Sequence, residues 1–205
     1  QGSCRLDRVT KARILDLPGT YSLNASSMDE SVVVELLLNK NNPDFPDVVV
    51  VVADVENLKR NLLLFTQIKD LEIPSVLVIN MSDQMQRKGI KIDLEKLEKK
   101  LNTKVVLVST RQNLGVKQLK QILVDYRSIP STPILDPTTI DQDYFESLSK
   151  AFPNQPVYKL WLMITQDVNF NKLKRKKVPD TAQFNTQPRT NLKKLQQRET
   201  IKRYH

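Results

Sequence analysis

Two short motifs in this sequence combine residue types that could bind a nucleotide through its phosphates and its base. The first is the segment Asp16-Leu17-Pro18-Gly19. An acidic side chain such as that of Asp16 could hold Mg²⁺ through a water molecule. Gly19, three residues later, would let the backbone approach a phosphate closely and donate an N–H. This motif therefore predicts contacts to a metal-bound phosphate.

The second motif, Asn80-Met81-Ser82-Asp83, predicts recognition of guanine. The carboxylate of Asp83 can accept two hydrogen bonds from the N1–H and N2–H₂ edge of guanine, a donor pair that adenine lacks. The Asn80 amide both donates and accepts, so it could hold the base and a nearby loop. A third segment, Ser109-Thr110-Arg111, could offer a backbone N–H to guanine O6.

Each motif taken alone also has a purely structural explanation. Asp16, Asn80 and Ser109 could each cap the helix that follows, and a turn explains a D-x-x-G pattern equally well. The three motifs, however, follow predicted strands in a fixed order along the chain. That order favours one nucleotide-binding site over three unrelated caps.

The elements that must position these motifs alternate between strand and helix. This alternation predicts an α/β fold of the P-loop GTPase type, with a doubly wound, mostly parallel sheet. Ligands of such sheets bind beyond the carboxyl ends of the strands, where the three motifs stand. We expect strands at 11–16, 48–54, 75–79 and 105–108 and helices at 31–39, 58–68, 94–101 and 116–126, with Asp93 capping the third helix.

The C-terminal third has a different composition and predicts a small helical subdomain. Prolines interrupt residues 128–139, which read as a linker between a G domain at 1–127 and a helical region at 140–205. We expect helices at 141–150, 157–170 and 191–204. The last should carry Leu192, Leu195 and Ile201 as its apolar residues.

The composition excludes several kinds of site. Cys4 is the only cysteine and His205 the only histidine, so an internal disulfide, a Ser-His-Asp triad and a His/Cys zinc site are not expected. The longest apolar run, Val48–Ala53, is far shorter than the roughly 20 residues that cross a bilayer.

The formal net charge is +9, and the basic excess lies toward the C-terminus. Solvated helix faces are the first interpretation, a segment facing anionic lipid the second, and nucleic-acid binding the third, because no recognition motif accompanies the charge. The residues concerned are Lys172, Lys174, Arg175, Lys176, Lys177, Lys193, Lys194, Arg198, Lys202 and Arg203.

Several segments resemble the bacterial ferrous iron transporter B family (FeoB). The Pro-Gly-Thr-Tyr-Ser-Leu continuation of the first motif is more specific than D-x-x-G, and Met81 stands where most small GTPases have lysine. The resemblance covers nearly the whole chain. It runs through Asp16–Glu30, Pro46–Val49, Asp54, Arg60–Leu62, Asn80–Asp83 and the tail Leu195–Tyr204.

The resemblance implies a GTP/GDP- and Mg²⁺-binding G domain followed by a subdomain described as a guanine-nucleotide dissociation inhibitor. Residues 16–19 would serve Mg²⁺ and the γ-phosphate, Asn80, Met81 and Asp83 would hold guanine, and 109–111 would line the base pocket. Residues 20–30 would form a switch whose order depends on the γ-phosphate.

The family also implies where the parent protein acts. It would be an iron transporter of the bacterial inner membrane, with this region on the cytoplasmic face beside its own transmembrane domain. A homo-oligomer is compatible with this arrangement, and nucleic acid is not an expected partner.

The sequence departs from the family in its phosphate-binding residues. The only glycines are Gly2, Gly19, Gly89 and Gly115, so no G-x-x-x-x-G-K-[ST] loop can be written. The central strand before that loop is missing too, which suggests a truncated chain or further upstream residues. The chain as it stands should bind GTP weakly or not at all.

The catalytic residue cannot be named from this sequence either. Thr20 follows Gly19, where Ras-like GTPases carry a water-positioning glutamine, so we expect slow hydrolysis in the intact domain. Two alternatives remain open. A soluble ribosome-associated GTPase would bind RNA tightly and salt-sensitively, whereas a non-catalytic scaffold module would bind no nucleotide even when completed at its N-terminus.

Overall fold

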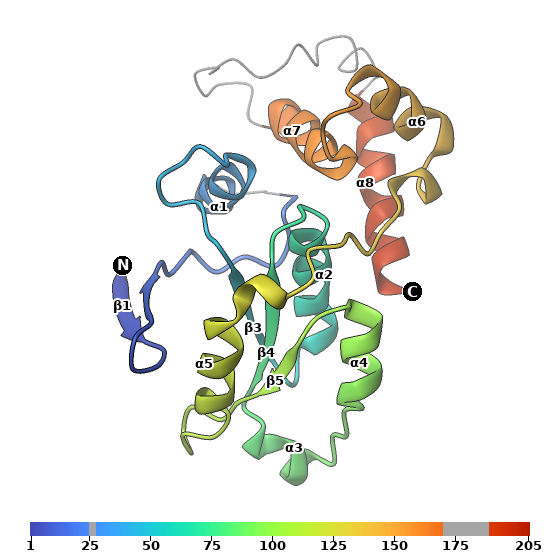
Figure 1. Ribbon diagram of the computed structural model, residues 1–205. Helices are drawn as coiled ribbons and strands as arrows, with labels where there is room; N and C mark the ends of the chain where they lie inside the picture. Colours follow the sequence, from blue (N-terminus) through green and yellow to red (C-terminus); the bar gives the residue numbers. More distant parts are fainter. Residues whose placement is uncertain (25–27, 170–188) are drawn as a thin grey trace.

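The centre of the molecule is a three-stranded parallel sheet. The computed structural model describes residues 1–24, 28–169 and 189–205 (Figure 1). The strands β3 (Val49–Asp54), β4 (Ser75–Asn80) and β5 (Val105–Leu107) lie in that order. Parallel neighbours joined through helices are the arrangement that the alternating sequence pattern predicts, and the predicted α/β class is confirmed.

Helices cover both faces of this sheet because successive side chains of a strand point to opposite faces. Val51 and Ala53 face the core that includes α2 (Leu58–Lys69) and α4 (Leu94–Leu101). Val76, Val78 and their neighbours face α5 (Val116–Val124), which continues into a 3₁₀ turn at Tyr126–Ser128.

Strand β3 is less completely buried than its apolar sequence predicts. The strand pairs with β4 on one edge only, and Val52 is 61% exposed. By alternation, Val52 lies on the face that α5 covers, and α5 packs mainly over β4 and β5. A strand of valines was expected to be covered on both faces, but no helix in the described part of the chain covers β3 at Val52.

The strand expected at 11–16 does not join the central sheet. It is shorter, β2 (Lys11–Ile14), and pairs antiparallel with β1 (Gly2–Arg5) to form a separate hairpin. The predicted strand is confirmed over residues 11–14, but its expected place in the parallel sheet was wrong, because the polar partner segment Gly2–Arg5 carries no strand pattern of its own. The hairpin is tied to the rest by Arg13, which pairs with Asp44 at 2.9 Å, and by Lys120, which donates to the Arg5 carbonyl at 3.0 Å.

The remaining helices of the first part follow the sequence pattern with one addition. Helix α1 (Met28–Leu38) buries Val33, Val34 and Leu37 and packs beside α7 (Val157–Asn169). Asp93 caps α4, since its Oδ1 accepts the Lys96 N–H at 3.0 Å, as predicted. The short helix α3 (Asp83–Lys88) was not predicted.

In the C-terminal part, the described residues form three packed helices after a 3₁₀ turn at Pro137–Thr139. They are α6 (Gln142–Ala151), capped by Asp141, α7 (Val157–Asn169) and α8 (Arg189–Tyr204). Tyr144, Phe145 and Trp161 form a cluster of edge-to-face rings. Figure 1 shows α8 running beside α7 and down toward α2.

Helix α8 corrects two sequence-based expectations. Leu192 and Leu195 are buried as predicted, but Ile201 is 58% exposed. Arg203, grouped above with solvated basic residues, has a side chain only 1% exposed. The place of Ile201 on the inner face is taken by Glu199 and Arg203. The basic residues 172–177 and the side chain of Val168 lie outside what the structure describes.

One hydrophobic cluster connects the two parts of the molecule. It contains Leu23, Phe65 and Ile79 together with Trp161 and Leu195, so the sheet region and the helical region share a core. Over residues 1–24, 28–169 and 189–205, no helix combines the length and apolarity needed to cross a membrane.

Candidate functional site

Two loops beyond the carboxyl ends of β4 and β5 lie side by side and are hydrogen-bonded to each other. β4 and β5 are adjacent and parallel, so the residues that follow them emerge at the same sheet edge. The Ser82 N–H donates to the Val108 carbonyl at 3.1 Å. The second and third motifs therefore occupy one place in the fold.

The closest contact between these loops joins Asp83 to Ser109. The Ser109 hydroxyl donates to Asp83 Oδ1 at 2.8 Å, and Ser109 is fully buried. Asp83 is half-buried, and among the described residues its Oδ2 receives only a 3.3 Å bond, from the neighbouring Gln84 amide. Ser109 therefore orients a carboxylate that keeps hydrogen-bonding capacity on its second oxygen.

Asn80 makes the second link between the loops. Its Oδ1 accepts the Thr110 N–H at 3.4 Å, a long bond, and Asn80 itself is half-buried. Met81, the next residue, has a φ of 62° and is 41% exposed. A left-handed backbone at a non-glycine residue marks a constrained turn, which directs the chain from β4 into α3.

A tight turn presents the third motif to solvent. The Ser109 N–H donates to the Leu114 carbonyl at 3.2 Å, and the Leu114 N–H donates back to the Ser109 carbonyl at 3.0 Å. Thr110 and Arg111 at the turn are exposed. Within the described part of the chain, the Arg111 N–H has no hydrogen-bond acceptor.

Gly115 fixes this turn against the sheet, and the sequence reasoning missed it. Its φ is +76°, and a Cβ at this position would lie 2.1 Å from the Leu107 carbonyl oxygen. Only glycine therefore allows α5 to begin so close to the end of β5. A glycine directly before an apolar helix pattern, in a chain with four glycines, was the available signal.

The first motif lies apart from the other two in its contacts. Asp16, Pro18 and Gly19 are exposed, and Leu17 packs against the core. No hydrogen bond or ion pair joins Asp16 to another residue that the structure describes. A Cβ at Gly19 would meet nothing within 4 Å, so space is open for a ligand beside this backbone.

The residues present therefore fit a guanine base better than they fit its phosphates. Asp83, Asn80 and the Arg111 N–H offer the acceptors and donors that a guanine edge requires. Asp16 is the only carboxylate of the first motif, and the described residues contain no group of three or more His, Cys, Asp or Glu that could hold a metal.

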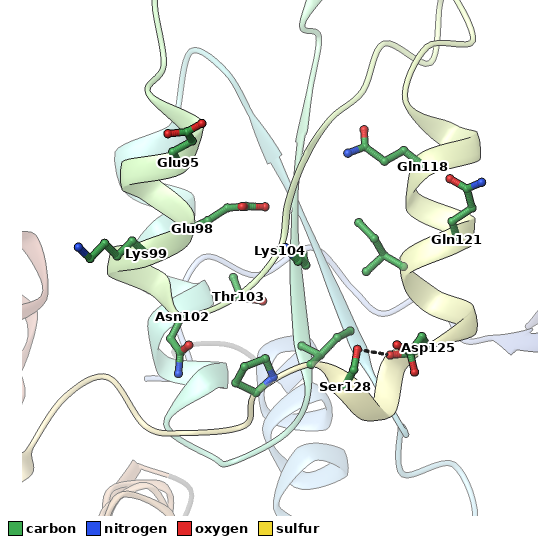
Figure 2. Close-up of a pocket in the computed structure, with 13 residues that line it drawn as sticks. Glu95, Glu98, Lys99, Asn102, Thr103, Lys104, Gln118, Gln121, Asp125 and Ser128 are labelled. Atoms are coloured by element: carbon green, nitrogen blue, oxygen red, sulfur yellow. Dashed lines mark hydrogen bonds between the residues drawn. The ribbon is translucent and has the colours of Figure 1, made fainter.

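A separate groove lies along the outer edge of β5. Figure 2 shows this groove of about 930 Å³ between α4 and α5. Glu95 and Glu98 of α4 and Gln118 and Gln121 of α5 contribute polar side chains to its walls. None of the residues of the three motifs lines it, so this groove is distinct from the candidate base site.

Comparison with known proteins identifies the family. A family model described as ferrous iron transport protein B matches residues 1–123. The Fe(2+) transporter FeoB of Leptospira biflexa is 37% identical over 111 residues, which are 54% of this chain and 16% of that protein. The chain thus spans about a sixth of the length of the curated relatives that it matches.

Solved structures agree over both parts of the molecule. The FeoB G-domain of Methanococcus jannaschii matches with 35% identity and a TM-score of 0.56, over 61% of this chain and 77% of that one. The cytosolic domain of the T. maritima FeoB iron transporter, in a GDP form, matches with 26% identity and a TM-score of 0.68. That match covers 92% of this chain and 76% of the other. The chain belongs to the ferrous iron transport protein B family.

Proposed function

We propose that this chain is the regulatory guanine-nucleotide-binding module of a bacterial ferrous iron transporter, in which the GTP or GDP state governs Fe²⁺ uptake. The observation that carries the proposal is the 2.8 Å bond from Ser109 to Asp83, which orients a carboxylate at the carboxyl edge of the sheet. The GDP form of the T. maritima relative supports the same ligand class.

The chemistry of base recognition follows from these contacts. The Asp83 carboxylate accepts the N1–H and N2–H₂ groups of guanine, with the Gln84 contact giving way to the base. The Arg111 N–H, which lacks a protein acceptor within the described residues, donates to O6. Adenine presents the opposite pattern at this edge and would leave the carboxylate facing an acceptor.

Phosphate binding requires groups that this chain does not carry. Asp16 and Gly19 would serve Mg²⁺ and the γ-phosphate, but no phosphate-binding loop can be written from the sequence. The unpaired edge of β3 and the exposed Val52 leave room for an added strand and a covering helix. An N-terminal strand–loop–helix segment taken from a member of the family would supply these elements. We term this chain with such a segment joined to its N-terminus the extended chain.

The test is a titration of fluorescent GDP, GTP and ATP analogues into the chain and into the extended chain. We expect the extended chain to bind GDP and GTP but not ATP, and the chain alone to bind all three weakly or not at all. Absence of binding by both proteins would contradict the proposal and favour a non-catalytic scaffold. Tight, salt-sensitive RNA binding would instead favour the ribosome-associated alternative.

The module would act at the cytoplasmic face of the inner membrane, beside the transmembrane domain of the same protein.

Slow hydrolysis of GTP is part of the proposal. The Thr20 hydroxyl, at the position of the water-positioning glutamine, already donates to the Ser22 carbonyl at 3.0 Å. Slow turnover suits a regulatory switch, because the nucleotide state then lasts long enough to be sensed.

A further inference from the structure

A buried polar junction joins the segment after Gly19 to the helices of both parts of the molecule. Leu23 is fully buried, and its N–H donates to Gln67 Oε1 on α2 at 2.8 Å. Its carbonyl accepts the Gln166 Nε2–H on α7 at 3.2 Å. The backbone of this single residue is therefore held by one side chain from the sheet region and one from the helical region.

Gln67 is the residue that connects this segment to the C-terminal helix. The side chain is fully buried, and its Oε1 also accepts the Ser22 hydroxyl at 3.1 Å. Its Nε2 donates to Glu199 Oε1 on α8 at 3.3 Å. One glutamine on α2 thus contacts both the segment 22–23 and α8. We term Leu23, Gln67, Gln166 and Glu199 the Leu23 junction.

Glu199 anchors the other end of the junction inside the helical region. This carboxylate is fully buried and accepts the Tyr158 hydroxyl at 2.8 Å and the Trp161 indole N–H at 2.9 Å. With the Gln67 bond already described, the Arg203 Nε–H is the fourth donor, at 3.0 Å. A change at Gln67 therefore alters the hydrogen bonds of a carboxylate that joins α7 to α8.

The low exposure of these groups makes their contacts interdependent. A buried polar atom that loses its partner costs about 1–3 kcal/mol, and more when the atom is charged. If the segment 22–24 left its place, Gln67 and Gln166 would each lose an acceptor or donor that water cannot readily replace. The network therefore favours two arrangements, one fully bonded and one released, over intermediate ones.

We propose that the Leu23 junction makes the segment 22–24 and helix α8 one cooperative unit, with Gln67 as the positioning residue that transmits a displacement from one to the other. The direction of the signal rests on the proposed function, because residues 20–30 are the predicted nucleotide-dependent switch. The mechanical link itself needs no nucleotide and can be tested without one.

Hydrogen exchange of the nucleotide-free 205-residue chain tests the link. Gln67→Met keeps the length of the side chain and removes its hydrogen bonds. We expect amides of 22–24 and of 192–203 to exchange at least tenfold faster, while amides of β4 stay unchanged. Thr66→Val is the matched control, because the Thr66 hydroxyl bonds only the Leu63 carbonyl of its own helix. This control should leave both segments unchanged.

The link must also operate in the reverse direction. Glu199→Met replaces a residue of α8, and we expect it to speed exchange at 22–24 as well. If circular dichroism shows that either variant is unfolded, Gln166→Met at the half-buried α7 position replaces it, with the same joint response expected. Faster exchange at only one of the two segments would overturn the proposal. If no nucleotide bound but both segments responded together, the proposed function would be contradicted and the link between segment 22–24 and α8 would still hold.

Discussion

At the scale of single residues, this chain places charged and polar side chains in its interior as well as at the candidate base site. Asp70, Glu199 and Arg203 form a buried cluster in which Arg203 Nη1 lies 2.7 Å from Asp70 Oδ2. Burial raises the pKa of Asp70, and the Arg203 charge and backbone N–H groups of Ile134 and Leu135 oppose that rise. The neighbouring carboxylates and the Tyr158 oxygen raise the pKa of Arg203 despite its burial.

Removing the one cation of this cluster should therefore be costly. Arg203→Met leaves the carboxylates of Asp70 and Glu199 buried without the guanidinium that pairs with both, and we expect a loss of about 3–5 kcal/mol in the free energy of unfolding. Lys202→Met, one residue earlier and exposed, should change it by less than about 0.5 kcal/mol. Urea unfolding of both variants measures the difference, and equal losses would contradict the role assigned to Arg203.

At the scale of elements, the aromatic cluster of α6 and α7 should make the fold less stable at alkaline pH. Burial raises the pKa of the Tyr144 phenol to about 12, and its hydroxyl has no hydrogen-bond partner among the residues that the structure describes. The folded protein keeps a proton that the unfolded chain releases near pH 10, so stability falls as pH rises from about 10 to 12.

Tyr144→Phe should remove part of that loss. At pH 7 we expect the variant to be at least as stable as the parent chain, because no hydrogen bond is removed. Between pH 10 and 12 its stability should fall by about 1–2 kcal/mol less. The buried Tyr158, whose pKa is also raised, should still lower the stability of the variant as the pH rises. Urea titrations at pH 7, 10 and 12 test this, and identical slopes for both proteins would refute it.

Most elements were predictable because their signals are local. Apolar runs and helical spacing predicted β3, β4, β5 and every described α-helix except α3 to within a few residues, and Asp93 predicted a helix start. The hairpin at 2–14 was missed because its pairing depends on a polar partner segment. The exposure of Val52 could not be predicted, since it depends on which helix covers that part of the sheet.

The candidate site was predictable in part. The order of the motifs along the chain predicted that Asn80, Asp83 and Ser109 meet at one sheet edge, and their hydrogen bonds join them there. Gly115 and the Leu23 junction were not predicted. Buried Gln67, Glu199 and Arg203 have residue types that a sequence pattern assigns to the surface, and only packing reveals them.

At the scale of the whole molecule, the shared core predicts one cooperative unfolding transition. Residues of the sheet region and of the helical region belong to a single hydrophobic cluster. We expect Trp161 fluorescence, from the only tryptophan, to change at the same urea concentration as the far-ultraviolet circular dichroism of the whole chain. Two separate midpoints would show that residues 140–205 unfold independently.

The most direct test of the central claim, that Asp83 reads guanine, is to exchange its acceptor for a donor. In the extended chain, Asp83→Asn presents an amide N–H₂, which pairs with the 2-oxo group of xanthine instead of the N2–H₂ group of guanine. We expect the variant to lose at least tenfold in GDP affinity and to bind xanthosine diphosphate more tightly than the parent does. Unchanged GDP affinity, or loss of both nucleotides alike, would contradict guanine recognition by Asp83.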